Sequence, residues 1–184
     1  MATHKPIEVQ ELLGDLTPSS GDVKWSVIRT KHRMEKKLAE YAHKLGIHYY
    51  LPMTDSIKTY QYRKVKFTKP LFTGYIFIKT NYEGMKHIYN SGCVSTVLKI
   101  PSEKQLLDEL QSLYNYRSRG AIMVPREYLE KGVEVVIEKG PFKGLKGYLE
   151  SISNSNKLIL NVDLLHQAVE ITVSSSDVKV VYEN

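Results

Sequence analysis

The chain has 184 residues, of which 42% are hydrophobic and 25% are charged, and its formal net charge is +6. This apolar content is enough to build a folded core, which excludes a wholly disordered chain. The single cysteine, Cys93, excludes a disulfide framework and a cysteine-rich zinc site. No apolar run has membrane-spanning length and no signal-peptide pattern is present, so we expect a cytoplasmic protein without membrane contact.

Positive charge is concentrated in one segment of the chain. Residues 24–69 carry twelve basic and three acidic residues, whereas residues 128–184 carry six basic and eight acidic residues. Segregated positive charge indicates a polyanionic partner, usually nucleic acid, although a solubilising surface would have the same composition.

The first part of the chain predicts a mixed α/β domain at residues 23–116, after a flexible leader at residues 1–22 that lacks apolar periodicity. Alternating or apolar runs predict strands at 23–29, 47–51, 74–79 and 94–100. Helical spacing predicts helices at 34–45, 82–89 and 103–116, and the apolar face of the second should consist of Tyr82, Met85, Ile88 and Tyr89. The polar, basic stretch 56–69 predicts either an extended hairpin or a flexible loop.

The second part predicts an all-β domain at residues 128–184, after a linker at residues 117–127 that contains Gly120 and Pro125. Five short strand candidates follow the linker, at 133–137, 147–152, 157–162, 169–173 and 178–182. So many short strands in so short a segment fit a small barrel, which leaves no exposed sheet edge. The predicted fold class is therefore α+β.

Two motifs resemble a known family. The first is KPLFTGYIFI at residues 69–78, and the second is VEVVIEKGPFKGLKG at residues 133–147. They are similar to the amino-terminal (NGN) domain and to the KOW motif of the NusG family of transcription elongation factors. Across residues 23–182 the resemblance implies an NGN domain, an antiparallel sheet flanked by helices, linked to an all-β KOW barrel of the Src-homology-3-like type.

Two details concern the type of family member. Thr73 stands where the family commonly has a proline. The segment DLLHQAV at residues 163–169 is more similar to the specialised antiterminators of the RfaH and UpxY types than to the housekeeping factor. The resemblance therefore favours a specialised member, and the β-branched strands at the carboxyl end favour a barrel that does not refold into helices.

Large apolar side chains in the first motif suggest a protein-binding surface. Leu71, Phe72 and Tyr75 should cluster at the edge of the sheet, either as ordinary core or as an exposed apolar pocket that accepts a helix. The resemblance implies that this region seats the clamp helices of the RNA polymerase largest subunit, and Trp25 of the first strand is added to the same site.

Basic residues form two candidate nucleic-acid sites. The first comprises residues at the start of the first helix, where the helix dipole disfavours cations: Lys31, His32, Arg33, Lys36 and Lys37. The second comprises Arg63, Lys64 and Lys66, which alternate with Tyr60, Tyr62 and Phe67. Cations beside aromatic rings suit single-stranded nucleic acid. The resemblance implies the non-template DNA strand of the transcription bubble.

In the second motif, Phe142 and Lys143 lie in a turn between strands. Phe142 is expected either to cap the barrel or to dock a protein. The resemblance implies a small-subunit ribosomal protein as the partner or, for the housekeeping factor, the termination factor Rho.

No nucleotide-binding, hydrolase or metal-ligand motif is present, so we expect neither an enzyme nor a cofactor or metal site. Three functions for a monomeric protein remain open. The first is a polymerase-bound antiterminator whose KOW domain recruits a second partner. The others are a housekeeping NusG that acts with Rho in termination and a ribosome-associated KOW protein that binds RNA. The acidic balance of residues 128–184 speaks against the RNA-binding protein.

Overall fold

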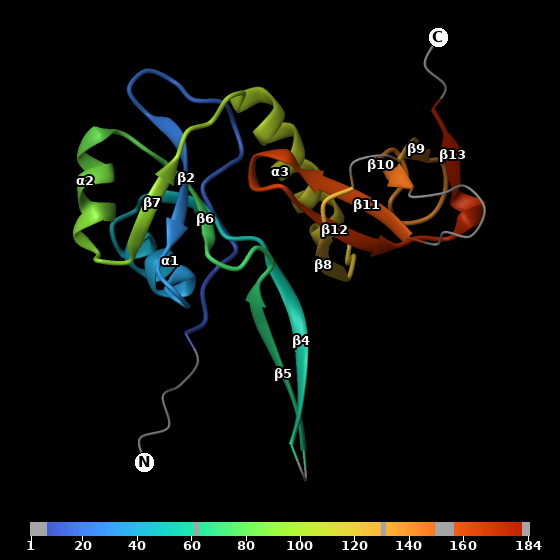
Figure 1. Ribbon diagram of the computed structural model, residues 1–184, viewed down its shortest axis with the longest axis horizontal. Coiled ribbons are helices and arrows are strands. Elements are labelled where there is room, and N and C mark those ends of the chain that lie inside the picture. The colour runs from blue at the N-terminus through green and yellow to red at the C-terminus, as the bar shows by residue number, and fades with distance from the viewer. Residues whose placement is uncertain (1–6, 61–62, 130–131, 150–156, 182–184) are drawn as a thin grey trace. The chain divides into compact units, whose positions relative to one another are not determined.

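The computed structural model describes residues 7–60, 63–129, 132–149 and 157–181 (Figure 1). The chain divides into two compact units. The first unit comprises Met1–Met53 and Thr68–Glu103, and the second comprises Thr54–Phe67 and Lys104–Asn184. Helices and antiparallel sheets occur together, so the predicted α+β class is confirmed.

The first unit is built on a five-stranded antiparallel sheet. Its strands lie in the order β1 (Leu12–Leu13), β3 (His48–Tyr50), β6 (Tyr75–Thr80), β2 (Lys24–Thr30) and β7 (Val94–Leu98). β6 lies at the centre, and Ile76, Phe77 and Ile78 are fully buried. A continuous apolar run is expected for a strand that is covered on both faces, so the predicted central strand is confirmed.

Two helices pack on one face of this sheet, α1 (Glu35–Lys44) and α2 (Tyr82–Asn90) (Figure 1). Leu38, Ala42 and Ile88 from the helices join Ile28 and Ile76 from the strands in a single buried cluster. α2 begins at Asn81, whose side-chain oxygen accepts a hydrogen bond from the Gly84 N–H at 2.9 Å. Both helices were predicted near these positions.

The predicted apolar face of α2 is only partly correct. Ile88 is fully buried and Met85 packs against the core, but Tyr82 is 74% exposed and Tyr89 is 54% exposed. Successive helical residues are about 100° apart, so Tyr89 points about 100° away from Ile88 and lies almost directly above Tyr82. Both tyrosines therefore belong to the outer face of the helix.

The predicted flexible leader is bound to the sheet over much of its length. Leu12 and Leu13 of β1 pair with Tyr50 and Tyr49. The Trp25 indole N–H donates to the Thr17 carbonyl at 2.8 Å. A two-residue strand is too short to produce a periodic pattern, so β1 was not predicted. The first six residues of the predicted leader lie outside the described residues.

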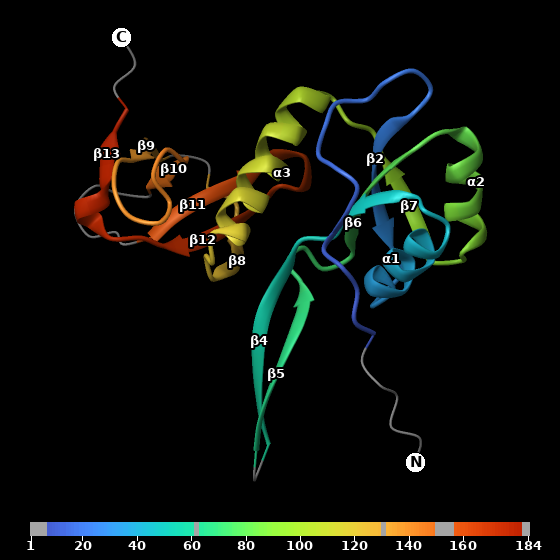
Figure 2. The same cartoon turned by 180° about the vertical axis from the view of Figure 1, so that it is seen from behind.

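The described residues of the stretch 56–69, which are 56–60 and 63–69, lie in two paired strands of an extended hairpin, one of the two alternatives expected. β4 (Met53–Tyr60) and β5 (Arg63–Pro70) form a two-stranded sheet and run side by side in both views (Figures 1 and 2). Residues 61–62, which include Tyr62, lie outside the described residues.

The second unit contains α3 (Glu103–Ser118) from Lys104 onward and a six-stranded antiparallel sheet. Its strands lie in the order β13 (Val178–Val180), β9 (Val133–Ile137), β10 (Lys146–Leu149), β11 (Lys157–Val162), β12 (Gln167–Thr172) and β8 (Met123–Glu127). Short 3-10 helices occupy Asp163–Leu165 and Ser175–Asp177. β9 to β13 correspond to the five predicted strands; residues 150–152 and 182 of the predicted ranges lie outside the described part.

The predicted linker at 117–127 has regular structure in the second unit. It holds the end of α3 and the edge strand β8, in which Pro125 is opposite Val169 and Met123 is opposite Ile171. Proline has no N–H to donate and is tolerated mainly in edge strands. Because a proline argues against a strand in sequence, β8 was not predicted.

Candidate nucleic-acid and partner-binding site

The turn after β5 is joined to the β2–α1 loop through Gly74. Gly74 has a φ of +87°, a conformation that favours glycine. Its N–H donates to Glu35 Oε1 at 2.6 Å, and its carbonyl accepts from the Thr30 N–H at 2.8 Å. Glu35 is 4% exposed and lies in the first turn of α1, where the helix dipole favours a carboxylate. The first motif and the loop therefore form one fixed arrangement.

The β2–α1 loop presents cations on this fixed backbone. Lys31, His32 and Arg33 are exposed, as is Lys37 of α1. None of the four forms an ion pair with another residue in the part of the chain that the structure describes. Arg33 has a φ of +58°, and a non-glycine residue in this left-handed region costs about 1–2 kcal/mol. Strained backbone of this kind concentrates at functional sites.

Lys36, the fifth predicted cation of this group, is used inside the unit. Its Nζ donates to the Thr68 carbonyl at 2.7 Å and so ties α1 to β5. Partial burial lowers the pKa of Lys36. This side chain is less available to an outside ligand than Lys31 or Lys37.

The hairpin carries the second predicted cluster. Arg63, Lys64 and Lys66 are exposed, and Phe67 is 39% exposed on the same strand. Phe67 therefore supplies an exposed aromatic ring beside these basic side chains, as expected. Lys66 also helps the Arg117 guanidinium to lower the pKa of Asp55.

Three of the four residues assigned to polymerase binding are buried. Leu71, Phe72 and Trp25 are 2%, 1% and 4% exposed, so the expectation of an exposed apolar pocket is wrong for these side chains. Large apolar groups next to a central strand gain more from burial than from water contact. Tyr75 is half-buried and is the one member of the four that reaches the surface.

In the second unit, Phe142 and Lys143 contact the carboxyl-terminal end of α3. The Phe142 ring is half-buried, and its centroid lies 5.5 Å from that of Tyr116. The Tyr116 hydroxyl donates to the Lys146 carbonyl at 3.2 Å, and burial raises the pKa of Tyr116. Arg119 donates to the Lys143 carbonyl at 2.9 Å. The Phe142–Lys143 turn therefore already contacts Tyr116 and Arg119 within the second unit.

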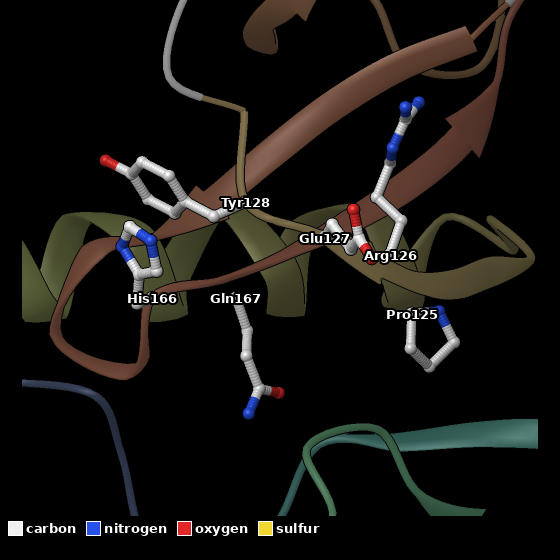
Figure 3. A pocket seen from close by; sticks show the side chains of 6 residues that line it. All are labelled: Pro125, Arg126, Glu127, Tyr128, His166 and Gln167. Atoms are coloured by element: carbon white, nitrogen blue, oxygen red, sulfur yellow. The ribbon is translucent and has the colours of Figure 1, made fainter.

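An open recess lies where β8 leads into the following segment (Figure 3). Its lining residues are Pro125, Arg126, Glu127, Tyr128, His166 and Gln167. The Tyr128 and His166 rings stack with centroids 4.3 Å apart. The Tyr128 hydroxyl donates to Asp163 at 2.7 Å, and this bond raises the pKa of Tyr128 to about 12. The Tyr128 hydroxyl is therefore already engaged with Asp163 inside the second unit.

An acidic pair lies beside this recess, between α3 and the segment after β11. The Asp163 N–H donates to Glu109 Oε2 at 3.3 Å, and Gln105 binds both carboxylates. Burial and the nearby charge of Asp163 raise the pKa of Glu109 to about 7. Glu109 therefore titrates near neutral pH.

The described part of the chain lacks two other features that would point to a function, a metal-binding cluster and a membrane-spanning helix. No group of three or more histidine, cysteine, aspartate or glutamate residues there could hold a metal ion. None of the described helices is both long and apolar enough to cross a membrane. Cys93 is 2% exposed, so its free thiol is buried.

Two features of the first unit were missed in the sequence. One is the hydrogen bond between Glu35 and Gly74. The local sequence showed only that Glu35 is an acidic residue in the first turn of a helix. The other is the outer face of α2, where Tyr82, Lys86 and Tyr89 follow the spacing i, i+4 and i+7.

Comparison with known proteins agrees with the first of the two motifs. A search of curated proteins finds no match. Among solved structures, the crystal structure of the MjSpt4:Spt5 complex, conformation B, is 21% identical over 87% of this chain and 98% of that chain, with a TM-score of 0.27. That score is too low to establish a shared fold. The family model described as "Transcription termination factor nusG" matches residues 23–131, more than half of the chain. The chain belongs to the NusG family of transcription factors.

Proposed function

We propose that the chain binds RNA polymerase during elongation and promotes antitermination. The observation that carries this proposal is a group of exposed basic residues that form no ion pair within the described part of the chain, Lys31, His32, Arg33 and Lys37, held next to the first motif by the Glu35–Gly74 bond. The cations are the elements expected to contact the non-template DNA strand. The motif beside them is expected to meet the clamp helices of the polymerase largest subunit.

The proposed mechanism requires no covalent chemistry. A factor that contacts the polymerase clamp and the exposed DNA strand favours the closed, active conformation if it binds that conformation more tightly than the paused one. A preference of about 1.4 kcal/mol would change the ratio of the two conformations tenfold. The family membership supports a role in transcription, and the cations support the DNA contact.

Within the proposed polymerase site, the four residues have different roles. Tyr75 offers a half-buried ring at the surface, so it is the residue we expect to touch the polymerase. Leu71, Phe72 and Trp25 are buried and are expected to hold the surface in shape from beneath.

We propose that the KOW-like segment of the second unit recruits a second partner, a small-subunit ribosomal protein, through Phe142 and Lys143. The half-buried Phe142 ring packs on Tyr116, so a partner would either cover the exposed part of the ring or displace Tyr116. The Lys143 side chain is exposed and is free to take part in such a contact.

A second candidate is a housekeeping role in which the protein acts with Rho and increases termination. The printed description of the matching family, a transcription termination factor, is the observation that favours it. The two candidates share polymerase binding and differ in the direction of the effect at a terminator.

The test is a reconstituted bacterial elongation complex stalled before a terminator, with and without the protein and with and without Rho. Increased readthrough supports the proposal, and increased Rho-dependent termination supports the second candidate. A protein that changes neither and is not retained on core polymerase contradicts both. Tyr75→Ala should weaken retention on polymerase, whereas Tyr148→Ala, which removes a 40% exposed tyrosine from β10, should not.

A further inference from the structure

The outer face of α2 carries a row of exposed side chains. Tyr82, Lys86 and Tyr89 follow the spacing i, i+4 and i+7 and therefore lie along one line of the helix. We call these three residues the α2 stripe. The tyrosine rings are 74% and 54% exposed, and Lys86 Nζ lies 4.4 Å from the centroid of the Tyr82 ring.

The Tyr82 and Tyr89 rings are not needed for the packing of α2 on the first unit. The inner face of α2 is supplied by Ile88 and Met85, and the start of the helix is capped by Asn81. Large aromatic side chains left at the surface of a protein frequently mark a binding site. The α2 stripe is thus a surface without a role in the core.

The carboxyl-terminal end of the α2 stripe adjoins the β2–α1 loop. The Gly92 N–H donates to the Tyr89 carbonyl at 3.1 Å, and the Lys31 N–H donates to the Cys93 carbonyl at 2.8 Å. α2, β7 and α1 lie in the same part of the first unit (Figure 1). The exposed rings and the exposed basic residues Lys31, His32 and Arg33, which form no ion pair with any residue the structure describes, therefore belong to neighbouring segments.

We propose that the α2 stripe is a stacking platform for the bases of single-stranded DNA, whose phosphates are held by the loop cations. This inference rests on the proposed DNA contact of the β2–α1 loop and extends it to a second element. Bases stack on exposed aromatic rings regardless of sequence, and cations beside the rings bind the backbone.

The charges on the two elements support this division of roles. On α2, Lys86 pairs with Glu83 at 2.8 Å, so the stripe offers ring faces and little net charge. On the loop, Lys31 and Arg33 form no ion pair among the described residues, and a strand of phosphates complements their positive charge. Seven helical residues span about 10 Å, so Tyr82 and Tyr89 could contact bases about three stacked nucleotides apart.

The experiment measures the fluorescence anisotropy of a dye-labelled oligothymidylate of about 12 nucleotides, a length within the usual range of single-strand sites, titrated with the full chain. Tyr82→Ala and Tyr89→Ala should each weaken binding at least about fivefold, the lower end of what one lost stacking contact costs. Tyr82→Phe and Tyr89→Phe keep the ring and should bind normally. Tyr148→Ala removes an exposed tyrosine elsewhere and should also bind normally.

A second variant separates this inference from the proposed function. Lys31→Ala should weaken DNA binding and lower the salt dependence by about 0.7 in the log–log slope, the value for one phosphate on a single strand. The tyrosine variants should leave that slope unchanged, because stacking releases no counterions.

Three outcomes would overturn the inference. If Lys31→Ala weakens binding but both tyrosine-to-alanine variants bind normally, the platform is wrong and the proposed DNA contact stands. If none of these variants changes the affinity, both are wrong. If an oligouridylate of the same length binds more tightly than the oligothymidylate with the same dependence on Tyr82 and Tyr89, the ligand is RNA and the assignment to DNA is overturned.

Discussion

The two candidate sites differ in how far their side chains are already engaged within the protein. On the β2–α1 loop of the first unit, hydrogen bonds hold the backbone while Lys31, His32 and Arg33 remain exposed and unpaired in the described structure. On the turn of the second unit, the Phe142 ring packs on Tyr116. A fixed backbone with exposed, unengaged side chains can bind a ligand without rearrangement. A ring that already packs on another residue must share or give up that contact before a partner can bind it fully.

The same contrast applies within the first motif. Phe72 and Leu71 are buried, so their size and shape support the unit, whereas Tyr75 beside them is half-buried. Substitutions can therefore separate residues that maintain the fold from residues that meet a partner. The following four predictions do so, from the largest expected change in stability to the smallest.

Phe72→Ala should lower the free energy of unfolding by about 3–5 kcal/mol, because it removes a fully buried aromatic ring and leaves a cavity. Tyr75→Ala should cost about 1 kcal/mol, since this side chain is only half-buried. Urea denaturation followed by circular dichroism measures both. A Phe72→Ala protein of normal stability that fails to bind polymerase would show that Phe72 is a docking residue.

Glu35→Ala should cost about 2 kcal/mol, because the Gly74 N–H loses a charged hydrogen-bond acceptor at a buried position. Glu35→Gln keeps an acceptor oxygen and should cost less. The matched control is Glu40→Ala on the same helix, where the carboxylate pairs with Lys44 at the surface, and its effect should stay below about 0.5 kcal/mol. Equal losses for Glu35→Ala and Glu40→Ala in urea denaturation would refute the structural role of Glu35.

Phe142→Ala should lower the stability of the second unit by about 1 kcal/mol through loss of the ring contact with Tyr116. Lys143→Ala should change it little, since Arg119 binds the backbone carbonyl of Lys143 and not its side chain. A double-mutant cycle with Phe142→Ala and Tyr116→Leu should give a coupling energy of about 0.5–1.5 kcal/mol. A coupling energy of zero would mean that the Phe142 ring is free for a partner.

Glu109 should make the stability of the second unit pH-dependent. Its pKa is raised to about 7 from 4.5, so the folded state binds more protons than the unfolded state between these values. The stabilising contribution is complete below about pH 4.5 and is lost as the pH rises through 7, with a size on the order of 1 kcal/mol after solvent screening. Urea midpoints from pH 5 to 8 should show this decline, and Glu109→Gln should flatten it; an unchanged profile in the variant would contradict the assignment.

Sequence alone determined the elements whose pattern is local. The central strand, the helices α1 to α3 and the five strands β9 to β13 follow from apolar periodicity and from turn residues, because these depend on neighbouring positions. The first motif, whose residues are contiguous, also pointed to the family that the matching model shows.

Tertiary structure decided what depends on distant residues. β1 and the edge strand β8 exist because they pair with β3 and β12, partners that are remote in sequence. The Glu35–Gly74 bond joins residues 39 positions apart. No local pattern encodes such pairings, because the free energy of a backbone bond depends on which group the fold brings opposite it.

Tertiary structure also decided which aromatic side chains are exposed to solvent. Sequence could not distinguish the buried Phe72 from the exposed Tyr89, since each aromatic residue directly follows a large aliphatic residue and precedes a polar one. The amount of water that each ring excludes depends on how strands and helices pack around it, and this is a property of the assembled unit. The sequence therefore determined where aromatic and basic residues occur, and only the fold decided which of them remain at the surface.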